Sequence, residues 1–288
     1  MRTVPGLLVV ASVVSAQSGS AVARTLFGEL GPAGTLAWRM GFAALVLAVA
    51  VRPRVWRWTG AAWRAAVLLG VFAAGLTLLS YLALRTAPQG IVVTASFAGP
   101  LILALAQTRR VADLVCALTA GAGVALLGLR AGAEVPMAGL ALALAAGACG
   151  AGYIVFSARL GAAVPGVGGL AVSFAVAALL VLPFGFTGAV RAFAQPRLLG
   201  GAVIVALLAG VIPYALELIA LRDLPTRVFG VLMSLQPAAA ALAGRLILGQ
   251  RLGPVPILAL VLVSVAGAAL VRSSHEARPT EPSPQTPP

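Results

Sequence analysis

The chain has 288 residues, of which 61% are hydrophobic and only 9% are charged, and its mean hydropathy is +1.05. Soluble domains carry roughly 25% charged residues, so this composition excludes a water-exposed globular surface and predicts an all-α polytopic membrane protein. The net charge of +13 comes from arginines in short connections and chain ends, which is typical of an orientation signal in a membrane and not of a nucleic-acid-binding face.

Ten apolar stretches follow one another along the chain, each close to the 20 or so residues that a helical span needs. Their predicted bounds are 4–23, 34–51, 65–84, 90–107, 111–129, 137–157, 167–187, 200–221, 225–248 and 254–271. The remaining segment, 272–288, is rich in Pro, Ser, Thr and Glu, so we expect a disordered cytoplasmic tail. The first stretch also resembles a cleavable signal peptide, but a retained helix is favoured because the repeat described below requires it.

Arginines divide unevenly between the two predicted sides of the membrane. With the N-terminus inside, twelve arginines fall on the inner side and seven on the outer side, while Arg39 falls within a span. The cluster from Arg52 to Arg64 is the strongest anchor. The positive-inside rule therefore predicts a multi-pass protein with both termini in the cytoplasm.

The two halves of the chain share a pattern of arginine and proline. The matching pairs, all separated by 137 residues, are Arg85 with Arg222, Pro88 with Pro225, and Pro100 with Pro237. Coincidence in a proline-rich chain is the alternative. Because five spans are an odd number, a second half of five spans inserts upside down. We therefore predict ten transmembrane helices as two inverted five-helix repeats, 4–129 and 137–271, with a substrate site near the midplane between them.

The stretch 212–249 contains a carboxyl group, Glu217, inside an apolar segment and three helix-weakening prolines. Burying a charge in hydrocarbon is unfavourable unless the charge is paired or faces water. Desolvation favours the neutral form of such a group, so Glu217 is a candidate proton-coupling residue or a partner for a substrate ammonium. Alternatively, it lies close enough to the helix end to pair with Arg222 or Arg227.

Other polar side chains within predicted spans are candidates to bind substrate beside Glu217. They are Gln17, Ser18, Tyr81, Ser96, Tyr153, Tyr214 and Gln236. Buried tyrosine hydroxyls need a partner or water, and Tyr214 shares a helix face with Glu217. Ser96 and Gln236 lie near prolines that free backbone carbonyls. Interfacial tyrosines and ordinary polar contacts between helices are the alternatives.

Arg39 lies within the predicted span 34–51, near its outer end. It could hold a substrate carboxylate, although snorkelling to the outer headgroups or capping a neighbouring helix is the favoured interpretation. Cys116 and Cys149 stand singly in apolar runs, and the one histidine, His275, lies in the tail. These residues exclude Ser/His or Cys/His catalysis and metal-ligand spacing, so we predict no enzyme activity, metal or cofactor.

The most distinctive segments are Pro213-Tyr214-Ala215-Leu216-Glu217, Leu224-Pro225-Thr226-Arg227 and Phe229-Gly230-Val231-Leu232-Met233-Ser234-Leu235. They are accompanied by Gln17-Ser18-Gly19, Gly31-Pro32-Ala33-Gly34, Phe97-Ala98-Gly99-Pro100 and the Ala/Leu-rich run 141–149. With these segments, residues 4–271 resemble the EamA domains of the drug/metabolite transporter superfamily, above all its threonine/homoserine exporter group. The resemblance implies alternating-access efflux of small amino acids or related metabolites across the bacterial inner membrane, coupled to proton entry.

The chain departs from the exporter group where acidic residues are expected. Ser96, Gln236 and Gln250 stand where the group usually has glutamate, and Gly150 replaces a usual tryptophan. These changes keep open a same-fold carrier for a drug-like cation, a purine or a nucleotide-linked metabolite, working as exchanger or importer. A membrane-embedded enzyme or a regulator is the third reading. The expected partners are a small-molecule substrate and the bilayer, with no nucleic acid, for a monomer or homodimer.

Overall fold

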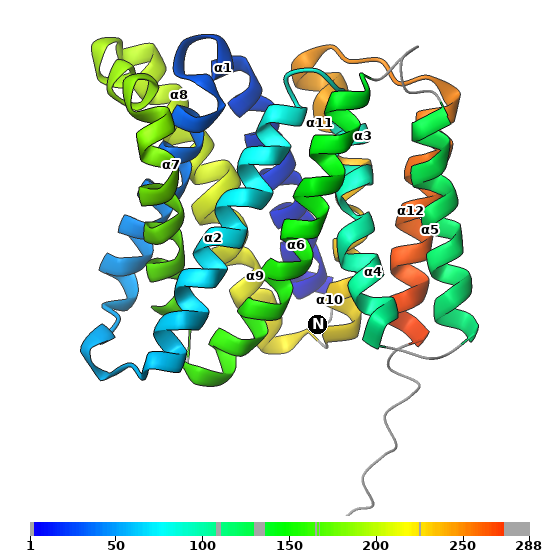
Figure 1. Cartoon of the computed structure of the whole chain (residues 1–288), viewed down its shortest axis with the longest axis horizontal. Coiled ribbons are helices and arrows are strands. Elements are labelled where there is room, and N and C mark those ends of the chain that lie inside the picture. Colours follow the sequence, from blue (N-terminus) through cyan, green and yellow to red (C-terminus); the bar gives the residue numbers. More distant parts are fainter. Residues whose placement is uncertain are drawn as a thin grey trace, which may run out of the picture.

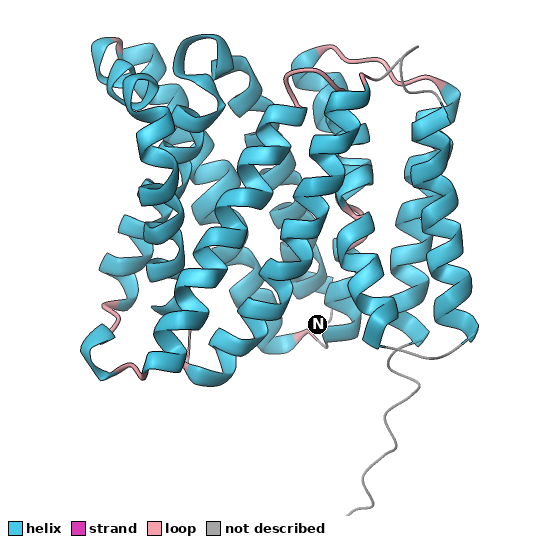
Figure 2. Ribbon diagram, in the orientation of Figure 1, coloured by secondary structure: helices cyan, strands magenta, loops and turns pink. Residues whose placement is uncertain are grey.

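Helices form nearly all of the structure, a computed structural model that describes residues 3–107, 111–129, 136–164, 166, 168–224 and 226–273. Within these ranges no residue lies in a strand, and the helices stand side by side in one bundle (Figures 1 and 2). The helices are α1 (Thr3–Val51), α2 (Gly60–Ala83), α3 (Gln89–Ser96), α4 (Ala98–Gln107), α5 (Val111–Leu129), α6 (Met137–Ala163), α7 (Gly168–Ala194), α8 (Pro196–Ala206), α9 (Ile212–Asp223), α10 (Thr226–Met233), α11 (Gln236–Leu248) and α12 (Pro254–Ser273). A short 3₁₀ helix, η1 (Val55–Arg57), precedes α2, and a π-helical turn, η2 (Leu207–Val211), joins α8 to α9. Most of the predicted tail lies outside the described residues.

Six helical stretches of the described chain are long and apolar enough to cross a membrane. They are Pro5–Val51, Gly60–Ala83, Met137–Ala163, Gly168–Ala194, Pro196–Glu217 and Val231–Leu248. Shorter apolar helices occupy Gln89–Leu103, Leu114–Gly123 and Pro254–Ala269. These stretches confirm an all-helical membrane protein, whereas ten separate crossings stay a prediction.

The first two predicted spans are joined in α1 by a sharp bend at Gly31. Its backbone angles, φ 68° and ψ 163°, suit glycine, which has no Cβ to clash at positive φ. Pro32 then begins the second arm with its φ already near the helical value. The 47-residue stretch would measure about 70 Å as a straight helix, more than twice the roughly 30 Å hydrocarbon core. The bend instead gives two arms that run in opposite directions (Figure 1).

Two predicted spans, 90–107 and 225–248, are each interrupted near the middle. Between α3 and α4 the helix breaks at Phe97, and between α10 and α11 it breaks before Gln236. Prolines account for both breaks, because Pro100 and Pro237 have no N–H to donate to the carbonyl four residues earlier. Each predicted span is therefore two shorter helices with a break between them.

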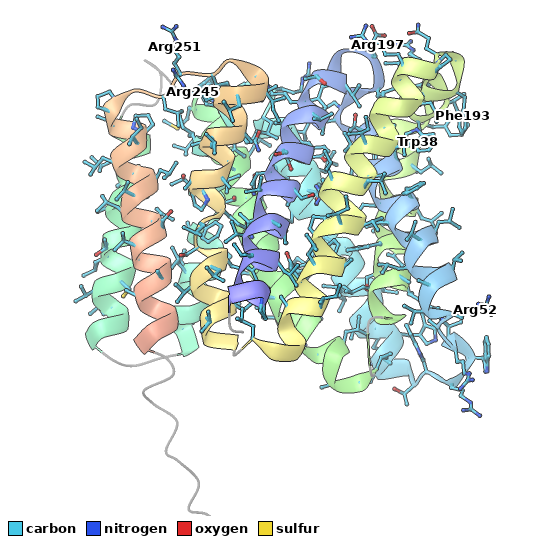
Figure 3. The ribbon with its side chains drawn as sticks, turned by 180° about the vertical axis from the view of Figure 1, so that it is seen from behind. Trp38, Arg52, Phe193, Arg197, Arg245 and Arg251 are labelled. Atoms are coloured by element: carbon cyan, nitrogen blue, oxygen red, sulfur yellow. The ribbon has the colours of Figure 1, made fainter. Side chains whose placement is uncertain are left out.

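Contacts between helices far apart in the sequence hold the bundle together. The most extensive are between α1 and α7, between α2 and α6, and between α5 and α12. In the second arm of α1, Trp38 Nε1 donates to the Ala189 carbonyl of α7 at 3.0 Å and its ring lies 5.2 Å from that of Phe193 (Figure 3). Large apolar side chains such as Phe184 (79% exposed) face outward, as expected for a surface in contact with lipid.

Labelled arginines lie at both ends of the bundle. Arg197, Arg245 and Arg251 lie at one end, and Arg52 lies at the other (Figure 3). The start of α1 and the end of α12 share the end that carries Arg52 (Figures 1 and 3). For these four residues the two ends agree with the predicted division into two sides, while the side that faces the cytoplasm stays a prediction.

Candidate functional site

A cavity of about 610 Å³ lies inside the bundle, lined by α1, α2, α3, α4, α6, α10 and α11 and by the break at Phe97. Its polar lining residues are Gln17, Ser20, Arg39, Thr77, Ser80, Tyr81, Gln89, Ser96, Tyr153 and Gln236. Apolar side chains, including Phe97 and Met233, complete the lining. The volume and the mixed lining are typical of a small-molecule site. A larger hollow of about 810 Å³ lies at the end of the bundle beside the loop 51–59, but its loop residues are mostly exposed.

Five of the eight predicted substrate-binding residues line this cavity: Gln17, Tyr81, Ser96, Tyr153 and Gln236. Ser18, Tyr214 and Glu217 are absent from the described lining. Ser18 is the neighbour of Gln17 on a helix, so it points in a different direction. The ring of Tyr214 packs against Phe174 at 5.0 Å between centroids. The predicted place of Glu217 in the cavity is therefore not confirmed, and it stays a prediction.

The three tyrosines of the chain lie around Arg39, which lines the cavity together with Tyr81 and Tyr153. Arg39 Nη1 donates to the Tyr81 hydroxyl at 3.3 Å, and its guanidinium carbon lies 5.9 Å from the centre of that ring. Tyr153 and Tyr214 lie close enough to interact with each other and with the charge of Arg39. Since Arg39 lines the cavity, the expectation that it snorkels to the outer headgroups is wrong.

Glu217 of α9 is in contact with the first arm of α1. Ser12 Oγ donates to Glu217 Oε1 at 2.6 Å, and the carboxyl group is partly buried. Its charge reaches Tyr153 and Tyr214, which connect it electrostatically to the tyrosine and arginine cluster. The alternative pairing with Arg222 or Arg227 concerns side chains outside those that the structure describes.

A π-helical turn precedes α9 on the same side of α1. In this turn the Ile212 N–H bonds to the Leu207 carbonyl, five residues earlier. The Leu208 carbonyl would next require Pro213, which has no N–H. Ser15 Oγ supplies the missing donor at 2.8 Å. Ser12 and Ser15, one turn apart in α1, therefore satisfy two polar groups of the η2–α9 segment.

A Ser15→Ala variant is expected to lose about 1 kcal/mol of stability, because the Leu208 carbonyl would keep no side-chain donor in an apolar setting. The melting temperature of the purified protein in detergent measures this loss. Thr25→Ala is the matched control in the same helix, since Thr25 Oγ1 is exposed and bonds to its own helix at Val22. Equal melting temperatures for the two variants would contradict the role of Ser15.

The buried Gln89 amide, which lines the cavity beside the predicted Gln17, was not predicted from the sequence. Gln89, which is fully buried, donates from Nε2 to the Gln17 carbonyl at 2.8 Å and to Gln17 Oε1 at 3.1 Å. Gln250 Oε1 accepts the Gln89 backbone N–H at 2.9 Å, at the start of α3. The available signal was the position of Gln89 directly after Pro88, where a helix begins with unsatisfied N–H groups.

Comparison with known proteins decides the family. The chain is 38% identical to the threonine/homoserine exporter RhtA of Escherichia coli (strain K12) over 267 residues, which cover 91% of this chain and 89% of that protein. It is 39% identical to the exporter of the same name from Salmonella typhimurium (strain SL1344), with the same coverage. Residues 137–273 match the EamA-like transporter family. The chain belongs to the EamA-like transporter family.

A solved structure described only as "Crystal structure of protein" has the same fold as this EamA-family chain. The two superimpose with a TM-score of 0.64 at 20% identity, covering 96% of this chain and 100% of the other. Family membership, together with the apolar helices, identifies a multi-pass membrane transporter. The cavity inside the bundle is therefore the candidate transport site of this EamA-family protein.

Proposed function

We propose that this EamA-family protein exports small amino acids of the threonine or homoserine type, or related metabolites, across the bacterial inner membrane. The observation that carries the proposal is its 38% identity, over 91% of the chain, to a protein named as a threonine/homoserine exporter. The cavity supports it independently. At about 610 Å³ it has room for a small amino acid, and its hydroxyl, amide and guanidinium groups offer partners to a polar substrate.

The proposed architecture is ten transmembrane helices in two inverted repeats, 4–129 and 137–271. The two broken helices support it: α3 and α10 have eight residues each and lie 137 residues apart, and each is followed by a helix with proline near its start. The pair α3–α4 also runs opposite to the pair α10–α11 (Figure 1). With two arms for α1 and one span for α8 to α9, the described helices amount to ten.

Transport proceeds by alternating access, with the two halves rocking about the cavity. The lining supports this, because α1 to α4 belong to the first half and α6, α10 and α11 to the second. Glu217 carries the proton that drives export, and both termini are cytoplasmic. The arginine excess at the predicted inner side supports that orientation. The protein works as a monomer or homodimer.

A drug-like cation is a poorer candidate for the cargo. The one charged side chain in the described lining is Arg39, a cation, which would repel a positively charged substrate in a low-dielectric site. A purine or a nucleotide-linked metabolite is a neutral or anionic rival. Neither has support comparable to the identity with the exporters.

Export is tested with purified protein in liposomes loaded with radiolabelled threonine, homoserine, a purine or a quaternary amine. Protein-free liposomes loaded in the same way are the control. We expect release of threonine or homoserine at least tenfold faster than from the protein-free liposomes, a difference of about 1.4 kcal/mol in the barrier. Release of the quaternary amine or the purine alone would contradict the proposal.

A further inference from the structure

We infer that Arg39 and Tyr81 form the carboxylate-binding end of the cavity, so that a free carboxylate group selects the substrate. The inference rests on the proposed function and deepens it. It begins from Arg39, a guanidinium group in the interior of a membrane bundle whose hydrogen-bonding capacity is largely unused.

Arginine has five N–H donors and cannot give up its charge. Among the described residues, Arg39 makes one side-chain hydrogen bond, from Nη1 to the Tyr81 hydroxyl at 3.3 Å, which is longer than a strong bond of this type. Its Nε is buried and has no partner. A guanidinium ion that has only neutral neighbours and one long hydrogen bond is unfavourable in such a site, so an anion that binds there gains both charge pairing and hydrogen bonds.

The surroundings hold this cation in the cavity wall. The Tyr81 ring, 1% exposed, packs against Phe27 at 5.1 Å between centroids. On the other side, the aliphatic part of the Arg39 side chain lies near Gly210 of the π-helical turn. A Cβ added at Gly210 would be in van der Waals contact with Arg39 Cγ, at 3.9 Å. Because the Tyr81 oxygen accepts from Arg39, its own O–H remains free to donate. Arg39 and Tyr81 therefore present donors to the same small volume.

The rest of the lining favours a carboxylate over a phosphate. The cavity contains no second cationic side chain among its described residues, so one negative charge is balanced and two are not. The remaining polar groups are neutral, such as Gln17, Ser96 and Gln236, and suit a hydroxyl or an amine of the substrate. A planar carboxylate also matches the planar donor pair of a guanidinium group.

The experiment measures inhibition of labelled threonine release from liposomes that contain the full-length wild-type protein. The competitors are unlabelled threonine and two of its derivatives, threoninamide and threonine methyl ester. The two derivatives keep the amino and hydroxyl groups of threonine but have no carboxylate. We expect the amide and the ester to inhibit at least tenfold less well than threonine. Equal inhibition by all three would overturn the inference while leaving amino-acid export standing, whereas no release of threonine at all would overturn the proposed function itself.

Variants of Arg39 test whether this residue produces the preference for threonine over its amide. Arg39→Gln is expected to reduce the preference for threonine over threoninamide to less than twofold, and Arg39→Lys to retain part of it through the charge alone. The matched control is Arg245→Gln, an exposed arginine at the end of α11, which should keep the full preference (Figure 3). If Arg39→Gln does not fold, the inference is tested on the wild-type protein alone. The rise in its melting temperature with threonine is then compared with the rise with the amide and with the ester. A folded Arg39→Gln variant that keeps the wild-type preference would overturn the inference.

Discussion

A Glu217→Gln variant is expected to lose all accumulation of substrate driven by a pH gradient. If one proton is exchanged for each substrate molecule, every unit of pH difference supplies about 1.4 kcal/mol, or about a tenfold ratio of substrate concentrations. Because protons and substrate move in opposite directions, the wild-type protein should accumulate substrate on the acidic side. Radiolabelled threonine distribution across proteoliposomes with an imposed pH difference measures this ratio, which should stay near one for the variant.

Glutamine at position 217 removes the titratable proton and leaves the side-chain packing nearly unchanged. Its amide oxygen has the shape of Glu217 Oε1 and can accept the bond that Ser12 Oγ now donates at 2.6 Å, but an amide does not bind and release a proton near neutral pH. Ser12→Ala is the matched control, since it removes the hydrogen bond and keeps the carboxyl group. We expect that variant to retain accumulation. Accumulation by Glu217→Gln equal to the wild type would show that the proton moves elsewhere.

The positions of the helices could be predicted from the sequence because apolar length is a local property. The predicted stretch 111–129 coincides with α5, and α6 and α12 begin where they were expected. The first predicted span ended at residue 23, whereas the helix continues to a bend at Gly31. The residues between 23 and 31 are compatible with a helix, and the backbone conformation of Gly31 is what interrupts it. Helices α6 and α7 outlast their predicted apolar runs because helices continue beyond the hydrocarbon, as at Arg159 and Arg191.

The site was only partly predictable because it depends on which helix faces pack together. Polar residues within spans were found, but the direction of Glu217 depends on Ser12, 205 residues away in the sequence. A lone serine in an apolar helix usually bonds to its own backbone, so Ser12 and Ser15 carried no distinct signal. The convergence of Tyr81, Tyr153 and Tyr214 on Arg39 is likewise a property of the bundle, which no local pattern encodes.

A Gly147→Val variant is expected to prevent assembly of the native bundle. Gly147 lies where α6 crosses the break between α3 and α4, and a Cβ added there would lie 2.5 Å from the Ser96 carbonyl oxygen. The crossing is tight from both sides, because a Cβ added at Gly99 would meet the Gly147 carbonyl oxygen. Both obstacles are backbone atoms that no side-chain rotation can remove. We expect a loss of about 3 kcal/mol or more, seen as little monodisperse protein in detergent and a lowered melting temperature.

Gly121→Ala in α5 is the control for this prediction, because a Cβ added there meets nothing within 4 Å. Alanine favours the helix over glycine by about 1 kcal/mol, so this variant should match or exceed the wild-type melting temperature. A Gly147→Val protein as stable as Gly121→Ala would mean that α6 does not approach α4 closely. The crossing also bears on transport, because Ser96 lines the cavity and its backbone is held against Gly147. Even the smaller Gly147→Ala change should therefore displace the cavity wall and slow export before it unfolds the protein.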